Sequence, residues 1–78
     1  MRKNEIKEGV FYRNKGKGTT IRRVIAIGDE HKPKHWYSDS EPPDEPGVLY
    51  SDIRGRQKSL YISSFAMWAG SEVNLIEW

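Results

Sequence analysis

The segment "RNKGKGTTIRRV", residues 13–24, has the composition of a possible anion-binding loop, because it combines glycines, hydroxyl groups and cations. A Walker-type phosphate loop has the pattern G-x-x-x-x-G-K-[ST] between a strand and a helix. Here Lys17 precedes Gly18, and the β-branched segment that follows favours a strand, so no helix N-terminus is available to hold a phosphate. We therefore predict a basic β-hairpin turn over 14–18, in which Gly16 or Gly18 supplies a positive φ.

The cationic side chains are gathered in the first half of the 78-residue chain. Residues 1–35 hold ten lysines and arginines and four acids, a formal charge of +6, whereas residues 36–78 hold three bases and seven acids, a charge of −4. A basic face of this kind can attract a polyanion. The alternative is an ordinary solvated surface of mixed charge.

Aromatic residues are interleaved with these bases. Trp36 and Tyr37 follow a lysine and a histidine, and Tyr12 is next to Arg13. Nucleic-acid bases stack on exposed aromatic faces, while Lys and Arg neutralise the phosphates. We expect Phe11, Tyr50, Phe65 and Trp68 in the core, and exposed contacts from Trp36, Tyr37, Tyr61 and Trp78.

Catalytic and metal chemistry have little support in the sequence. His31 and His35 are four residues apart, but Pro33 between them prevents a regular helix and no third ligand is evident. The chain has no cysteine, which excludes thiolate ligands, cysteine nucleophiles and disulfides. No nucleophile-elbow signature is present, and a domain this small offers little concave volume for a substrate. We predict a non-enzymatic protein that uses no metal and no cofactor.

The secondary structure predicted for the chain is mostly β-strand. Runs of β-branched and aromatic residues bounded by turn residues predict five strands. In the second strand both faces are apolar near residues 24–27, which is typical of a strongly bent strand. The predicted strands are 10–13, 19–28, 48–53, 58–62 and 72–78, with a tight turn at Gly55 between the third and fourth.

Two segments differ from this strand pattern. "SSFAMWAG", residues 63–70, predicts a short helical turn with Phe65 and Trp68 on one face, Ser63 or Ser64 as N-cap and Gly70 in a left-handed position at its end. Residues 39–47 contain three prolines and four acids and predict an irregular surface loop, with a short strand around 35–38 before it.

The order of these elements resembles an SH3-like barrel, in which a short helical turn precedes the final strand. "IKEGVFYRNKGKGTTIRRVIAI" is similar to the opening of a KOW-type domain, with Gly9, Gly16, Gly18 and Val24 matching its glycines and valine. The resemblance implies an all-β, five-stranded SH3-like barrel over residues 1–78, although the proline-rich insert departs from the compact KOW module. The chain is also similar in style to small proteins encoded by phages or prophages.

Two functions follow from these observations. The first is nucleic-acid binding, in which backbone phosphates contact Arg13, Lys15, Lys17, Arg22 and Arg23, with Trp36 or Tyr37 stacking on bases. The second is a protein-interaction module, such as a phage-encoded modulator of a host complex, in which the aromatics receive a proline-rich peptide. Steep salt dependence is expected of the first function and weak salt dependence of the second.

The sequence also carries expectations about location and assembly. No apolar run approaches the ~18 residues that span a bilayer, and the charged N-terminus has no apolar region behind it. We therefore expect a cytoplasmic protein with no membrane contact. An exposed final strand could pair with a second copy, so we expect a monomer or a weak homodimer.

Overall fold

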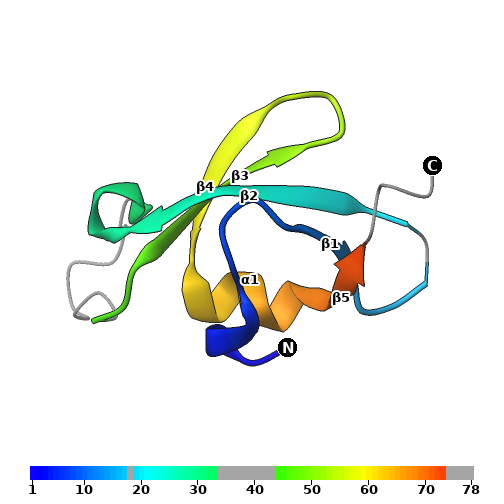
Figure 1. The fold of residues 1–78 in the computed structure, drawn as a ribbon, viewed down its shortest axis with the longest axis horizontal. Helices are drawn as coiled ribbons and strands as arrows, with labels where there is room; N and C mark the ends of the chain where they lie inside the picture. The colour runs from blue at the N-terminus through cyan, green and yellow to red at the C-terminus, as the bar shows by residue number, and fades with distance from the viewer. Residues whose placement is uncertain (18, 34–43, 74–78) are drawn as a thin grey trace.

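In the part of the chain that the structure describes, the fold is one antiparallel sheet of five strands with a single helix against it (Figure 1). The computed structural model describes residues 1–17, 19–33 and 44–73. The sheet order is β4-β3-β2-β1-β5, so β4 and β5 are its edges. This arrangement confirms the all-β prediction. The strands are β1 (Phe11–Asn14), β2 (Ile21–Gly28), β3 (Gly47–Asp52), β4 (Gln57–Tyr61) and β5 (Ala69–Val73); the helix is α1 (Ile62–Trp68), and the 3-10 turns are η1 (Lys3–Glu5) and η2 (Asp29–His31).

The predicted strand boundaries are right within two residues for β1 to β4. The last strand is different: it begins at Ala69, immediately after the helix, rather than at residue 72. Residues 74–78 of the predicted strand lie outside the described residues, as does the strand expected around 35–38. Gly47, the last residue of the predicted loop, already pairs in β3 with Gly28 and Tyr61.

A β-bulge at Ile25 explains why both faces of β2 are apolar. Val24 pairs with Tyr50 and Ala26 with Leu49, so Ile25 is an extra residue on β2. The extra residue reverses the alternation of side chains, which brings Val24 and Ile27 onto the same face. The carboxylate of Glu8 accepts the Ile27 N–H at 2.8 Å, which satisfies a donor beside the irregularity.

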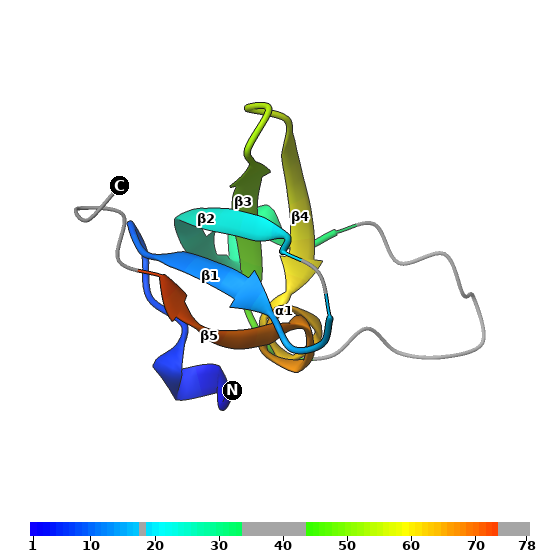
Figure 2. The same ribbon diagram turned by 90° about the vertical axis from the view of Figure 1, so that its right-hand side faces the viewer.

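The core lies between one face of the sheet and α1. Figure 2 shows the sheet bending so that both edge strands approach the helix. Tyr12, Val24, Val48 and Phe65 are fully buried there, and the ring centroids of Tyr12 and Phe65 are 5.7 Å apart with edge-to-face geometry. Tyr50 is also buried, and Trp68 is half-buried against the same cluster.

The prediction that Phe11 is a core residue is wrong. Neighbouring residues of a strand point to opposite faces, so only one of Phe11 and Tyr12 can face the helix. Tyr12 takes that place because its hydroxyl is satisfied: it donates to the Glu5 carbonyl at 2.9 Å and accepts the Lys7 N–H at 2.8 Å. Burial raises the pKa of the Tyr12 phenol. Phe11 is half-buried on the other face of the sheet.

Both predicted helix caps are also wrong. The N-cap of α1 is Tyr61, with no side-chain capping bond, and the Ser63 hydroxyl instead donates to the Glu45 carboxylate. At the other end, α1 continues directly into β5 through an extended Ala69, so no left-handed residue is needed. Gly70 has no positive φ; its Cα lies so close to β1 that an added Cβ would be 2.9 Å from the Asn14 carbonyl oxygen.

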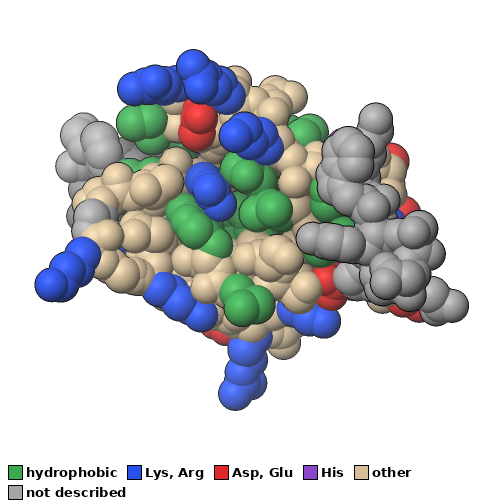
Figure 3. Space-filling model, turned by 180° about the vertical axis from the view of Figure 1, so that it is seen from behind, with side chains coloured by type: hydrophobic (Ala, Val, Ile, Leu, Met, Phe, Trp, Pro, Cys, Tyr) green, Lys and Arg blue, Asp and Glu red, His purple; other side chains and the backbone are tan. Residues whose placement is uncertain are grey.

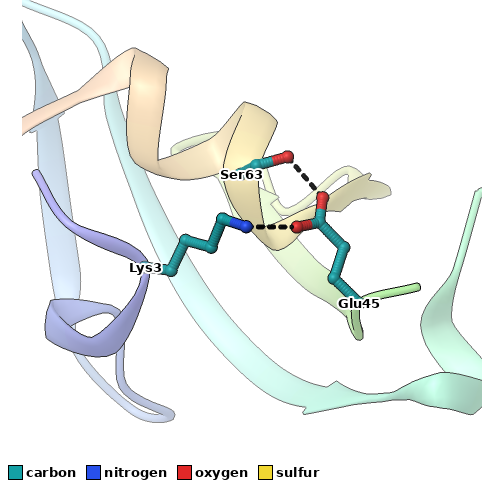
Figure 4. A network of polar contacts seen from close by, with 3 residues as sticks. All are labelled: Lys3, Glu45 and Ser63. Atoms are coloured by element: carbon teal, nitrogen blue, oxygen red, sulfur yellow. Dashed lines mark hydrogen bonds and ion pairs between the residues drawn. The ribbon is translucent and has the colours of Figure 1, made fainter. Parts of the chain in front are cut away.

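Glu45 connects the region before β3 to two other parts of the fold (Figure 4). Its carboxylate is 2.9 Å from the Lys3 ammonium in η1 and accepts a hydrogen bond from Ser63 in α1. The Glu45 side chain is only 9% exposed. The Ser63 hydroxyl is the main reason why the pKa of this carboxyl is lowered, with Lys3 adding to the effect.

Among residues 1–17, 19–33 and 44–73, no helix has both the length and the apolar character that crossing a membrane requires.

Candidate nucleic-acid interface

The topology brings two basic turns to the same end of the sheet. The turn between β1 and β2 carries Lys15 and Lys17, and the turn between β3 and β4 carries Arg54 and Arg56. Arg22, near the start of β2, pairs with Asp52, at the end of β3, so both turns lie at the same end of the sheet. We call this region the basic end; its cationic residues are Arg13, Lys15, Lys17, Arg22, Arg54 and Arg56.

Acidic residues lie at the opposite end of the strands. Asp29 and Glu30 follow β2, and Asp44 and Glu45 precede β3, where Gly28 pairs with Gly47. Two cations here are engaged with carboxylates, because the Lys32 ammonium is 3.6 Å from Asp29 and the Lys3 ammonium is 2.9 Å from Glu45. The charge is therefore separated along the strand direction, as well as between the two halves of the sequence.

Arg54 and Arg56 are basic-end residues that the sequence analysis did not select. They belong to the half of the chain whose formal charge is negative, so a count by halves assigned them to an acidic region. The signal that could have found them is the predicted hairpin at Gly55, because consecutive antiparallel hairpins place alternate turns at the same end. Gly55 has φ +83°, as a tight turn requires.

Two acidic residues, Asp52 and Glu72, lie near the basic end, and backbone N–H groups hold the carboxylate of Asp52. Asp52 accepts the backbone N–H groups of Arg54 and Arg56, each at 2.9 Å, and these bonds, with that of Arg56 the larger, lower the pKa of the carboxyl. Glu72, on the edge strand β5, pairs with Tyr12, which in turn pairs with Arg22, the partner of Asp52. The basic end therefore combines six cations with two nearby acids.

The five bases selected from the sequence do not share one face. Directly paired residues of a sheet point to the same side. Arg23 pairs with Phe11, and Arg13 pairs with Ile21, so these two exposed arginines lie on the face opposite the helix. The Arg23 guanidinium lies over the Phe11 ring at 5.6 Å. Arg22 pairs with the buried Tyr12 and therefore points to the helix side.

Lys15 and Lys17 are exposed, and neither ammonium forms a hydrogen bond or an ion pair with the described residues. The turn is held instead by Asn14: its amide donates to the Lys17 carbonyl at 3.2 Å and accepts the Thr20 N–H at 3.1 Å. Gly16 has no positive φ, so of the two glycines expected to supply the turn geometry only Gly18 stays a prediction. Gly18 lies outside the described residues.

Arg22 lies against two aromatic rings on the helix side of the sheet. Its Cζ is 4.7 Å from the ring centroid of Tyr50 and 4.3 Å from that of Trp68. On the side opposite the view of Figure 1, hydrophobic side chains gather near the middle of the surface, with lysine and arginine side chains among and around them (Figure 3). Cationic and apolar groups therefore share this surface.

A hollow of about 260 Å³ lies at the basic end, between the start of β2 and the turn that follows β3. Its walls combine hydroxyl groups, arginines and two isoleucines, of which Ile53 is 81% exposed. Such a surface presents hydrogen-bond donors for an anion beside apolar groups. The lining residues are Thr19, Thr20, Ile21, Asp52, Ile53, Arg54 and Arg56.

The expected stacking aromatics Trp36 and Tyr37 lie outside the described residues, as does Trp78. Tyr61 is half-buried at the start of α1. His31 is 3.6 Å from the Glu30 carboxylate. His35, the other histidine of the chain, is also outside the described part. Residues 1–17, 19–33 and 44–73 contain no group of three or more side chains that could hold a metal ion.

Comparisons of the chain with protein-family models, with curated proteins and with solved structures found no match.

Proposed function

We propose that this chain is a non-enzymatic domain of the SH3-like barrel type that binds nucleic acid through its basic end. The observation that carries the proposal is the convergence of six cations from two turns and two strands at one end of the sheet, away from the acids at the other. The five antiparallel strands and the helix before the last strand support the SH3-like assignment.

The arrangement of the cations suits a polyanion that is extended along the surface. Lys15, Lys17, Arg54 and Arg56 are exposed at turns, where their long side chains can each reach a different phosphate. Each phosphate that they neutralise releases counterions, which favours binding at low salt. The acids at the far end repel the same polyanion and so orient it toward the basic end.

A protein-interaction module is the second candidate, and exposed apolar side chains favour it. Met67 on α1 is 75% exposed and Ile53 is 81% exposed, so both side chains are available for apolar contact with a partner. A partner that binds through these residues would be held by apolar contact, and its affinity would change little with salt. The two functions therefore differ in one measurable quantity, the salt dependence of binding.

Binding of labelled single- and double-stranded DNA and RNA, measured by fluorescence anisotropy over a range of salt concentrations, tests the proposal. The parent should show a log–log salt slope of about −0.7 to −0.9 for each phosphate contacted. Lys15→Glu with Lys17→Glu should weaken binding to every sequence alike and make the slope shallower. Because both side chains are exposed, the unfolding free energy should change by no more than ~0.5 kcal/mol.

A matched control places the same charge change elsewhere. Arg2→Glu with Lys7→Glu also reverses two cations, but at exposed positions outside the basic end whose side chains form no ion pair with the described residues. This control should keep most of the affinity of the parent. Equal losses in the two double variants would mean that only net charge matters, and undiminished binding by the Lys15/Lys17 variant would reject the basic end as the interface.

A further inference from the structure

Arg22 differs from the other cations of the basic end because its guanidinium is held in a fixed place. It is half-buried, whereas Lys15, Lys17, Arg54 and Arg56 are exposed. Two aromatic rings lie within 5 Å of its Cζ, at 4.7 Å for Tyr50 and 4.3 Å for Trp68. Both distances are within the ~6 Å at which a cation is attracted to a ring.

The two rings are themselves fixed by the core. The ring centroids of Tyr50 and Trp68 are 5.5 Å and 5.3 Å from that of Phe65, which is fully buried. Tyr50 comes from β3 and Trp68 from the end of α1, so two separate elements determine the position of the Arg22 side chain. An arginine that is already ordered loses little conformational freedom when it binds a ligand.

The hydrogen-bonding capacity of this guanidinium is not used within the described part of the chain. There, no oxygen atom forms a hydrogen bond or an ion pair with the guanidinium of Arg22. Asp52 faces Arg22 across the register, but its carboxylate accepts the N–H groups of the following turn. A guanidinium has five N–H donors in a fork that matches the oxygens of a phosphate.

Charged residues of both signs share the face to which Arg22 points, Lys58 on β4 and Glu72 on β5. Lys58 is directly opposite Tyr50 in the register of β3 and β4, so it shares the face to which Arg22 points, and it is exposed. The backbone N–H of Lys15 donates to the Trp68 carbonyl at 3.2 Å, which brings the first turn beside the same ring. An anion at Arg22 would thus lie between the two basic turns.

We propose that Arg22 is a specific phosphate-binding residue, whose fork contacts one backbone phosphate of a bound single strand through two N–H groups. This inference rests on the proposed nucleic-acid binding. One phosphate is bound at Arg22 in a defined geometry, while exposed lysines and arginines attract the rest of the strand. The rings of Tyr50 and Trp68 act as positioning groups for the guanidinium.

The test compares Arg22→Lys with Arg23→Lys, using an oligothymidylate of about 12 nucleotides, within the site sizes of small single-strand-binding domains. Both substitutions keep the positive charge, but only a guanidinium can make the two-pronged contact. Arg23 is the neighbouring residue on the opposite face, so its replacement is a matched control. Thermal midpoints of both variants are measured alongside, because a folded Arg22→Lys protein is needed for the comparison.

We expect Arg22→Lys to weaken binding roughly threefold to tenfold, the loss of part of one charge-assisted hydrogen-bonded contact. Its salt slope should stay close to that of the parent, because the charge remains. Arg23→Lys should bind within about twofold of the parent. Equal affinities for Arg22→Lys, Arg23→Lys and the parent would overturn the role of Arg22 while leaving nucleic-acid binding in place. A parent that binds no oligothymidylate would reject the proposed function, and this inference with it.

A measurement on the unaltered protein covers the case in which Arg22→Lys does not fold. The side-chain Nε–Hε resonance of each arginine is followed by NMR during titration with inorganic phosphate and then with the oligothymidylate. The Arg22 resonance should shift with both, and more than that of Arg23. If it shifts with neither ligand, the proposal fails. If a third titration, with an acidic peptide, then shifts it, Arg22 serves a protein carboxylate instead and the phosphate assignment is wrong.

Discussion

At the scale of single residues, Tyr12 shows how one side chain can fix the orientation of a strand. Its ring fills the core against Phe65, and its hydroxyl joins β1 to the segment that precedes it through Glu5 and Lys7. Because Tyr12 points inward, Arg13 points outward to solvent, and the face on which each arginine of the hairpin lies follows from this choice.

Tyr12→Phe tests the contribution of the hydroxyl. The ring is kept, but the Lys7 N–H loses its acceptor in a buried place, which should cost about 1–3 kcal/mol of unfolding free energy. Urea denaturation measures the difference. Tyr61→Phe, at a half-buried tyrosine, is the control and should change stability by less than ~0.5 kcal/mol. Equal stability of Tyr12→Phe and the parent would show that the two hydrogen bonds contribute nothing net.

Glu45 gives the fold a dependence on acid pH. The Ser63 hydroxyl, and then Lys3, lower the pKa of this carboxyl in the folded state, so the folded protein binds the proton less readily than the unfolded chain. The stabilisation is therefore present above the unfolded pKa and is lost as pH falls through the folded pKa. Unfolding free energies between pH 7 and pH 3 should fall less steeply in Glu45→Gln than in the parent. Identical pH profiles would contradict the assignment.

At the scale of elements, strand positions were predictable from the sequence and the details of their ends were not. β-branched runs and the glycine turn at residue 55 are local signals, and the structure has strands and a turn there. The bulge at Ile25 and the end of α1 depend on contacts between elements. Ser63 could have capped the helix, but its hydroxyl donates a hydrogen bond to Glu45, 18 residues away in sequence, instead.

The same reasoning explains how much of the candidate site was predictable. Charge counting found Arg13, Lys15 and Lys17, which lie in or beside the first turn. It could not separate Arg22 from Arg23, because their different faces follow from the burial of Tyr12. It also missed Arg54 and Arg56, which reach the basic end only through the pairing of β2 with β3.

Gly70→Ala tests the close approach of β5 to β1. The added Cβ would lie 2.9 Å from two backbone atoms, the Asn14 carbonyl oxygen and the Lys15 Cα, so the strands must shift. We expect a loss of about 1–3 kcal/mol in unfolding free energy, as for other overpacked sites, measured by urea denaturation. Gly16→Ala is the control: nothing lies within 4 Å of its added Cβ and its φ is not positive, so it should be neutral or slightly stabilising. Similar effects of the two changes would contradict this packing.

At the scale of the whole molecule, the main feature is the separation of charge along the strands. A formal net charge of +2 conceals a basic end built from two turns and an acidic end built around η2 and the start of β3. Antiparallel pairing produces this separation, because alternate connections fall at opposite ends of the sheet. A polyanion should therefore meet the molecule in one orientation.

An NMR titration of the unaltered protein with an oligothymidylate at low salt shows whether the basic end is the binding surface. Amide resonances report on every part of the backbone at once, so they separate binding at one end from diffuse attraction. We expect shifts of the amide resonances that cluster in residues 13–24 and 52–58, with little change at residues 29–33 and 44–47. No shifts at near-millimolar oligonucleotide, or shifts spread equally over both ends, would contradict it.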